Sequence, residues 1–371
     1  MSTPNTAAPR FHALTVAHVE PETDGAVCVS FRVPEGLRQD FAFTPGQFLT
    51  LRATIEGHDV RRSYSICSTP SSLQQQGVLQ VGIRAVDGGV FSNWACTRLK
   101  AGEVMQVMTP DGRFCVKRQR ALHRVGFAAG SGITPILSIM THTLESQPES
   151  KFTLVYGNRR MASVMFNEAL QDLKDRYPNR LTLVHILSRQ AQEVDLLQGR
   201  IDGNKVKAIV QALLPVASMD EVFICGPEGM IESTEAALKA LGVPEQHLHT
   251  ERFATAARPA GAQAASAATD ASTGAVPSDQ VALRIIVDGK AHDLGLPATS
   301  SVLDAALQAG LDLPYSCKGG VCCTCRGKLL EGQVSMERNF TLQDDEVAKG
   351  YVLTCQARAL TPRVVVSFDE R

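Results

Sequence analysis

Four cysteines crowded into nine residues constrain the fold of this chain more than any other feature. They lie in the stretch PYSCKGGVCCTC, where four residues separate Cys317 from Cys322 and two residues separate Cys322 from Cys325. This C-x4-C-x2-C spacing is that of plant-type [2Fe–2S] sites, which take their fourth cysteine from far along the chain. Cys355 is the only cysteine further downstream. The spacing therefore predicts a [2Fe–2S] cluster with the ligands Cys317, Cys322, Cys325 and Cys355.

A zinc site and a structural disulfide are the alternatives for these cysteines. Zinc sites usually carry paired C-x2-C units, and the chain has only one such unit. Cys323 in place of Cys322 would change the spacings to five and one residues, so Cys323 is predicted to be a packing residue. The N-terminal stretch has no apolar run of the signal-peptide type. We therefore expect a cytoplasmic protein, in which the ten cysteines stay reduced.

The composition describes ordinary globular domains and excludes two classes of partner. The 371 residues are 44% hydrophobic and 20% charged, with a formal net charge of −1. A nucleic-acid-binding protein would show a basic excess, and a membrane span would need about 20 consecutive apolar residues. Neither pattern is present, so we expect no nucleic acid and no membrane as partner.

The pattern of apolar residues divides the chain into three domains and a linker. Residues 1–120 alternate apolar and polar in short runs between Gly and Pro, which predicts an antiparallel β-barrel. Residues 121–253 alternate strand-like and helix-like segments, which predicts a doubly wound parallel sheet. Residues 254–280 consist mainly of Ala, Ser, Thr, Gly and Pro, a composition typical of a flexible linker. Residues 281–371 are predicted to form a compact α+β domain.

Two glycine-containing motifs predict a dinucleotide site in the α/β region. GSGITP stands between a predicted strand and a predicted helix, where a pyrophosphate can approach a helix N-terminus. CGPEGM ends a later strand at the same edge of the sheet. Alone, the first motif is equally an ordinary strand-to-helix turn and the cysteine of the second equally a buried core thiol, but together they favour a nicotinamide site. The candidate residues are Gly130, Gly132, Thr134, Pro135, Cys225, Gly226 and Pro227.

Two other strand ends bear on the choice between NADPH and NADH. LVYGNRR supplies Arg159, and HILSRQ supplies Ser188 and Arg189. An NAD site typically offers a carboxylate to the ribose, whereas a 2′-phosphate is bound by arginine. Neither strand end starts with Asp or Glu, so NADPH is predicted in preference to NADH. The alternative is that these arginines are solvated surface residues.

Two motifs in the first region would suit a flavin. RRSYSICS offers an arginine for a pyrophosphate, an aromatic ring for stacking and hydroxyl groups for the flavin edge. GGVFSNWA begins a short predicted helix and would form a second phosphate cradle. For either motif taken singly, an exposed face of a strand is the favoured interpretation. The candidate residues are Arg62, Ser63, Tyr64, Ser65, Gly89, Val90, Phe91 and Ser92.

The order of these motifs resembles the ferredoxin–NADP reductase superfamily. R-x-Y-S, G-x-x-S, G-x-G-x-x-P and C-G-P-x-x-M follow one another, and a plant-type, β-grasp-like ferredoxin domain comes last, so the resemblance covers nearly the whole chain. It implies that Arg62, Tyr64 and Ser65 contact FAD and that Val90 to Ser92 hold its pyrophosphate. It also implies catalytic positions for Ser65, Thr134 and Cys225 beside flavin and nicotinamide. The 2′-phosphate would be bound by Arg159, Ser188 and Arg189.

Five stretches resemble the reductase subunits of bacterial phenylacetyl-CoA epoxidases more closely: VRRSYSICS, GGVFSNWA, LVYGNR, PYSCKGGVCCTC and MERNFTLQDDEVAKGYVLTCQ. This resemblance implies electron transfer from NADPH through FAD and the [2Fe–2S] cluster to the di-iron oxygenase subunits of a multicomponent epoxidase in aerobic phenylacetate catabolism. The long linker and Cys323, where a small residue such as Ser is expected, depart from that family. A reductase for another oxygenase or for a hybrid-cluster protein remains an alternative. So does a non-catalytic, redox-sensing flavin and iron–sulfur protein.

Overall fold

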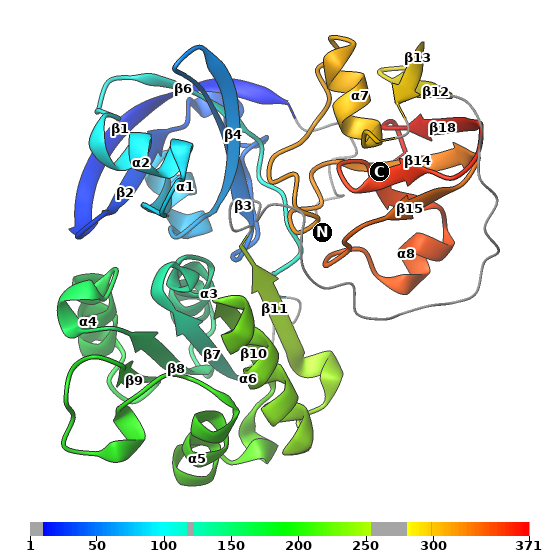
Figure 1. Ribbon diagram of the computed structural model, residues 1–371. Helices are drawn as coiled ribbons and strands as arrows, with labels where there is room; N and C mark the ends of the chain where they lie inside the picture. Colours follow the sequence, from blue (N-terminus) through cyan, green and yellow to red (C-terminus); the bar gives the residue numbers. More distant parts are fainter. Residues whose placement is uncertain (1–9, 117–121, 254–279, 298, 371) are drawn as a thin grey trace. The chain divides into compact units, whose positions relative to one another are not determined.

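The computed structural model describes residues 10–116, 122–253, 280–297 and 299–370 (Figure 1). The chain separates into two compact units, one spanning Phe11–Phe253 and one C-terminal unit that contains the cysteine cluster. The predicted linker, 254–280, lies outside the described residues except for Gln280. None of the helices in the described ranges is long and apolar enough to cross a membrane.

The first half of the larger unit is a six-stranded antiparallel sheet, here called the barrel domain. Its strand order is β4-β3-β6-β1-β2-β5, and the edge strands β4 and β5 meet through a bridge between Ile66 and Val81. The alternation of buried and exposed residues along β1, such as buried Leu14 and Val16 around exposed Thr15, places one face in the core. The predicted antiparallel domain is confirmed. The elements are β1 (Phe11–Thr23), β2 (Ala26–Arg32), β3 (Phe48–Ile55), β4 (His58–Ser65), α1 (Pro70–Gln76), β5 (Val78–Arg84), α2 (Val90–Thr97) and β6 (Val104–Met108).

The second half of the larger unit, here called the α/β domain, is a five-stranded parallel sheet with the order β11-β10-β7-β8-β9. Helices α3 and α4 pack in one core cluster with Phe152 and Tyr156, and helices α5 and α6 pack in another with Phe127 and Val155. Helices therefore cover both faces, which confirms the doubly wound prediction. The elements are β7 (His123–Ala129), α3 (Ile133–Ser146), β8 (Lys151–Asn158), α4 (Asn167–Arg176), β9 (Leu181–Leu187), α5 (Gly203–Leu213), β10 (Glu221–Gly226), α6 (Glu228–Ala240) and β11 (Leu248–Arg252).

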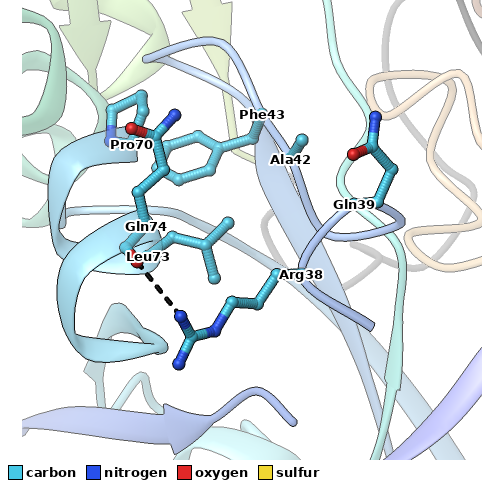
Figure 2. A pocket seen from close by; sticks show the side chains of 7 residues that line it. All are labelled: Arg38, Gln39, Ala42, Phe43, Pro70, Leu73 and Gln74. Carbon is cyan, nitrogen blue, oxygen red and sulfur yellow. Dashed lines mark hydrogen bonds between the residues drawn. The ribbon is translucent and has the colours of Figure 1, made fainter. Parts of the chain in front are cut away.

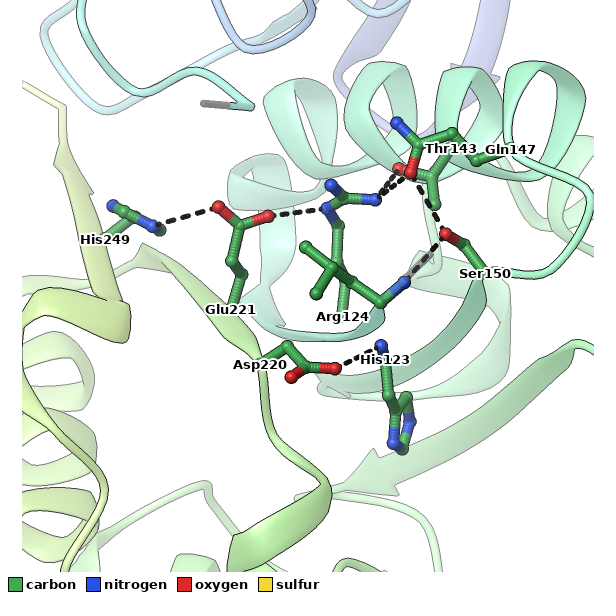
Figure 3. Close-up of polar contacts among 9 residues, drawn as sticks. His123, Arg124, Thr143, Gln147, Ser150, Asp220, Glu221 and His249 are labelled. Atoms are coloured by element: carbon green, nitrogen blue, oxygen red, sulfur yellow. Dashed lines mark hydrogen bonds and ion pairs between the residues drawn. The ribbon is translucent and has the colours of Figure 1, made fainter. Parts of the chain in front are cut away.

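A buried ion pair joins β7 to β10 at the amino ends of the strands (Figure 3). Arg124 is fully buried, and its Nε lies 2.8 Å from Oε2 of Glu221, which is 2% exposed. One Nη of Arg124 also donates to Oε1 of Gln147 at 2.6 Å, and His249 stands 3.9 Å from the other oxygen of Glu221. Because both nucleotide motifs follow the carboxyl ends of β7 and β10, this network lies at the opposite edge and supports the sheet.

The C-terminal unit is a mixed sheet with its own core. The strand order is β13-β12-β18-β14-β16, in which β12 and β18 run parallel and the other pairs antiparallel. Helix α7 buries Val302, Leu303 and Ala306 against this sheet. The predicted α+β, ferredoxin-like fold is confirmed. The elements are β12 (Gln280–Val287), β13 (Lys290–Pro297), α7 (Val302–Gln308), β14 (Arg326–Glu331), β15 (Val334–Met336), α8 (Asp344–Ala348), β16 (Tyr351–Leu353), β17 (Ala357–Ala359) and β18 (Arg363–Ser367).

Candidate functional site

The cysteine-rich loop of the C-terminal unit adopts an unusual backbone conformation. Lys318, Gly320 and Cys323 all have positive φ angles, of 50°, 77° and 60°. A Cβ at Gly320 would lie 2.8 Å from the carbonyl oxygen of Arg338, so glycine is required there by space as well as by φ. The loop thus turns its backbone N–H groups inward, and the N–H of Gly319 donates to Sγ of Cys317 at 3.2 Å.

The four predicted cluster ligands lie together as two pairs. The thiol of Cys317 is hydrogen-bonded to that of Cys322, and the thiol of Cys325 to that of Cys355. The bond from Cys322, with backbone N–H groups of the loop, lowers the pKa of Cys317 to about 6. The pKa of Cys355 is lowered by its bond with Cys325. In each pair, the contact between the thiols thus favours the thiolate form of one member, and the thiolate is the form that binds metal.

The donor set fits a two-iron cluster better than a single ion. Two cysteine pairs match a [2Fe–2S] cluster, which is held by four thiolates. Among the described residues, no group of three or more His, Cys, Asp or Glu side chains is arranged to hold one metal ion. No disulfide joins any of the ten cysteines, all of which lie in the described ranges. The choice of Cys317, Cys322, Cys325 and Cys355 as ligands stays a prediction that this arrangement supports.

Two side chains beside the cluster loop carry no signal in the sequence. Buried Gln356 donates from Nε2 to the carbonyl oxygen of Lys318 at 2.9 Å and lies 3.6 Å from Sγ of Cys355. It therefore ties the distant fourth cysteine to the loop that holds the other three. Thr324, also buried, forms a hydrogen bond that lowers the otherwise raised pKa of Cys322. Cys323 is half-buried against the core of the unit, in keeping with a packing role.

The two nucleotide motifs meet backbone to backbone in the α/β domain. A Cβ at Gly132 would lie 2.1 Å from the carbonyl oxygen of Cys225 and 2.8 Å from the nitrogen of Gly226. Gly130 has φ +54°, and its carbonyl accepts a hydrogen bond from the hydroxyl of Tyr156 at 2.9 Å. The carboxyl ends of β7 and β10 therefore form one continuous edge, as the order of the motifs predicts.

The remaining residues of these motifs surround that edge. Thr134 is buried and donates from Oγ1 to the carbonyl of Ser131 at 3.0 Å, and Pro135 lies in the first turn of α3. The side chain of Cys225 is fully buried, and burial raises the pKa of its thiol, so it is neutral at physiological pH. Pro227 is exposed and directly precedes α6.

The residues predicted for the 2′-phosphate lie together at the ends of β8 and β9. The backbone N–H of Arg189 donates to the carbonyl of Arg159 at 2.8 Å, and that of Ser188 to Asn158 at 3.0 Å. Both arginine side chains are exposed. Two guanidinium groups are thus carried on adjacent strands at the ligand-binding edge of the sheet.

The residues predicted for FAD lie at the end of β4 and the start of α2. The ring of Tyr64 packs 5.6 Å from that of Phe91, and burial raises the pKa of its hydroxyl. Arg62 is exposed, whereas Ser65 is buried. Ser63 shares a 3.3 Å hydrogen bond with Thr50.

The turn before α2 is held by its own side chains. Oγ of Ser92 accepts from the N–H of Val86 at 3.3 Å and donates to the carbonyl of Gly89 at 3.4 Å. A Cβ at Gly89 would lie 2.5 Å from Oγ of Ser92, and Val90 is exposed. An aromatic ring, an exposed arginine and a glycine-led helix start are groups that fit a flavin dinucleotide.

A surface hollow of about 270 Å³ lies elsewhere on the barrel domain (Figure 2). Arg38 lines the hollow and donates from Nη1 to the carbonyl of Gln74 at 3.1 Å. None of the predicted cofactor residues lines this hollow, so it is separate from the candidate site. It is lined by Arg38, Gln39, Ala42, Phe43, Pro70, Leu73 and Gln74.

Models of known protein families match all three folded parts of the chain. An oxidoreductase FAD-binding domain matches residues 15–116, an oxidoreductase NAD-binding domain residues 127–236, and a 2Fe-2S iron-sulfur cluster binding domain residues 285–360. Among solved structures, phthalate dioxygenase reductase is similar with a TM-score of 0.58 at 20% identity, over 96% of this chain and 98% of that one. The fold and its motifs therefore define a flavin- and iron–sulfur-containing oxidoreductase that uses a pyridine nucleotide.

Two curated relatives are similar over nearly their full length. One of the subunits of 1,2-phenylacetyl-CoA epoxidase from Escherichia coli is 46% identical over 97% of this chain and 98% of its own length. The ferredoxin reductase component of 3-ketosteroid-9-alpha-monooxygenase from Rhodococcus rhodochrous is 35% identical over 96% of both chains. The chain belongs to the family of oxygenase reductase components that includes these two proteins, which confirms the resemblance drawn from the motifs.

Proposed function

We propose that this protein is the NADPH-dependent reductase that supplies electrons to the di-iron oxygenase subunits of a phenylacetyl-CoA epoxidase. The observation that carries the proposal is the 46% identity, across 97% of the chain, to one of the polypeptides of that enzyme. Two features support the proposal. The joined nucleotide motifs would bind the electron donor, and the two cysteine pairs would hold the cluster that passes electrons to the partner.

We propose the domain limits 1–120 for FAD, 121–253 for the nucleotide, 254–280 as linker and 281–371 for the cluster. The three binding domains contain the family matches at 15–116, 127–236 and 285–360. If bound here, FAD would supply the chemistry that couples a two-electron hydride donor to a one-electron [2Fe–2S] centre. This chain's residues bind and orient these groups. Ten cysteines without a disulfide suit the reducing cytoplasm, which we propose as the location.

We propose cofactor-binding roles for the residues at the end of β4 and the start of α2, and for those at the carboxyl ends of β7 and β10. Arg62, Ser63, Tyr64, Ser65 and the turn from Gly89 to Ser92 would hold FAD. Gly130, Gly132, Thr134, Pro135, Cys225, Gly226 and Pro227 would hold the nicotinamide dinucleotide. Ser65, Thr134 and Cys225 would touch the reacting rings. Because its thiol is neutral, Cys225 would serve there as a packing and hydrogen-bonding group.

The proposal is tested by reconstitution with purified oxygenase subunits. With O₂ present, NADPH, the reductase and the oxygenase are expected to convert phenylacetyl-CoA to its epoxide and water, with tight coupling to NADPH consumption. The oxygenase of the 3-ketosteroid enzyme, whose reductase component is 35% identical to this chain, is the matched control partner. Equal or better coupling to that control would contradict the proposed partner. No reduction of ferricyanide by the fully loaded protein would favour the redox-sensing alternative.

Replacing Arg189 with alanine is expected to raise the KM for NADPH about tenfold, because one charge-assisted hydrogen bond to the 2′-phosphate would be lost. The KM for NADH should stay within about twofold, because NADH has no 2′-phosphate. Steady-state ferricyanide reduction measures both. Arg176→Ala, an exposed arginine in the last turn of α4, is the control. Unchanged KM values for both nucleotides would make Arg189 a solvated surface residue.

A further inference from the structure

One turn of the α/β domain has a strained backbone, because a residue other than glycine adopts a positive φ angle there. Phe166, the residue before α4, has φ 59° and ψ 30°. This left-handed conformation is rare for a bulky side chain, and it persists only where its surroundings enforce it. Such strain tends to occur where a structure must hold a group in one place.

A side chain of the barrel domain is hydrogen-bonded to this turn. Oε2 of Glu22, on β1 of the barrel domain, accepts a hydrogen bond from the backbone N–H of Phe166 at 2.8 Å. The two residues are 144 positions apart in sequence. Burial raises the pKa of the Glu22 carboxyl, and the N–H of Phe166 opposes that rise.

The strand that carries Glu22 is distorted at that residue. β1 pairs regularly with β2 except at two points, one of which lies between Pro21 and Thr23. Glu22 is therefore the extra residue of a β-bulge, a feature that redirects a side chain out of the regular pleat. The bulge directs the carboxylate to the α/β domain.

The ring of Phe166 packs on the same glycine of the barrel domain as Thr134, a residue of the candidate site. Phe166 is 6% exposed, and a Cβ at Gly82 of β5 would lie 3.0 Å from its Cζ. The same Cβ would lie 2.6 Å from Cγ2 of Thr134. Gly82 thus receives two side chains of the α/β domain, and one of them belongs to the GSGITP motif.

We infer that Glu22 is a positioning residue that fixes the Phe166 turn and, through it, sets the nucleotide motif against the barrel domain. The inference rests on the proposed function. Glu22 is not among the residues proposed above to bind either cofactor. It holds the strained turn in place, so that Thr134 and the first turn of α3 keep one distance from the sheet that carries the flavin residues.

The test compares Glu22→Ala with Glu22→Gln in the full-length, cofactor-loaded protein. The glutamine variant retains an oxygen that can accept from the Phe166 N–H, whereas the alanine variant does not. In stopped-flow measurements, Glu22→Ala is expected to slow flavin reduction by NADPH about tenfold, and Glu22→Gln by less than about twofold. Electron transfer to the cluster from flavin that has been reduced photochemically should be unchanged in both.

A second readout is independent of turnover. Hydrogen–deuterium exchange of a peptide covering residues 164–170 should be faster in Glu22→Ala and close to wild type in Glu22→Gln. Glu20→Ala is the matched control, since Glu20 is an exposed acidic residue two positions away on the same strand. It should change neither readout.

The outcomes separate this inference from the proposed function. A wild-type flavin that no pyridine nucleotide reduces would overturn the proposed function and the inference with it. A wild-type flavin reduced normally, and reduced equally fast in Glu22→Ala, would overturn the inference alone. So would a lowered melting temperature in Glu22→Ala with an unchanged rate of flavin reduction, because that result marks a purely stabilising contact.

Discussion

Replacing Cys325 with serine is expected to remove the [2Fe–2S] cluster while leaving flavin reduction intact. Cys325 is 2% exposed, and its thiol contacts that of Cys355. A serine hydroxyl stays protonated at neutral pH, whereas the cluster is bound by thiolates. The loss should be confined to the C-terminal unit, which has its own core.

The measurements are the visible spectrum, the EPR signal of the reduced protein, and reduction of cytochrome c by NADPH. The cluster signals and cytochrome c reduction should nearly vanish in Cys325→Ser, whereas flavin bleaching by NADPH should keep its wild-type rate. Cys323→Ser is the matched control two residues away, and it should retain the cluster. Retention of the cluster in Cys325→Ser, or its loss in Cys323→Ser, would mean that the ligand set is wrong.

The second large effect is expected at Gly132, where alanine should slow flavin reduction by NADPH about 10- to 100-fold. Its φ of −63° suits any residue, so the restriction comes from space alone. The added Cβ would stand 2.1 Å from the carbonyl oxygen of Cys225. Because the obstacle is backbone, the ends of β7 and β10 must separate, and both nucleotide motifs move.

Gly229→Ala is the control, because a Cβ at Gly229 meets nothing within 4 Å although this glycine belongs to the second motif. Stopped-flow flavin reduction and the Kd for NADP⁺ separate loss of hydride transfer from loss of binding. FAD content and circular dichroism verify the fold of both variants. A Gly132→Ala protein that is reduced as fast as Gly229→Ala would show that the two motifs need not touch.

The features that could be predicted from sequence are those encoded within short segments. The cysteine spacing fixes a cluster type by itself, and β9 and β10 coincide with the apolar runs LTLVHIL and EVFICG. Helix α5 and strand β11 carry no comparable pattern. Helix α5 follows the capping residue Asp202, whose carboxylate accepts a hydrogen bond from the N–H of Lys205. The run of apolar residues at helical spacing in α5 is short, because only Val206, Ile209 and Val210 are buried. The five residues of β11 are all only half-buried and lack an apolar run.

The contacts that assemble the site could not be predicted, because they join residues far apart in sequence. Glu22 looks like any acidic residue of an exposed strand, and Phe166 like any apolar residue before a helix. Gly82 gives no sign that Thr134 packs on it, because a single glycine within a strand pattern has many uses. Gln356 stands next to Cys355, a predicted ligand, yet nothing in the sequence shows that its amide reaches back to Lys318.

The pairing of β7 with β10 has a consequence for the order in which the protein is made. Arg124 and Glu221 are 97 residues apart, so β7 leaves the ribosome long before its partner strand exists. At about 5–20 residues per second, that edge of the sheet stays open for roughly 5–20 seconds of synthesis. During this interval the guanidinium of Arg124 lacks the carboxylate of Glu221, so this charged group is more stable in contact with water than buried. A charge at the open edge would discourage neighbouring nascent chains from adding a strand there.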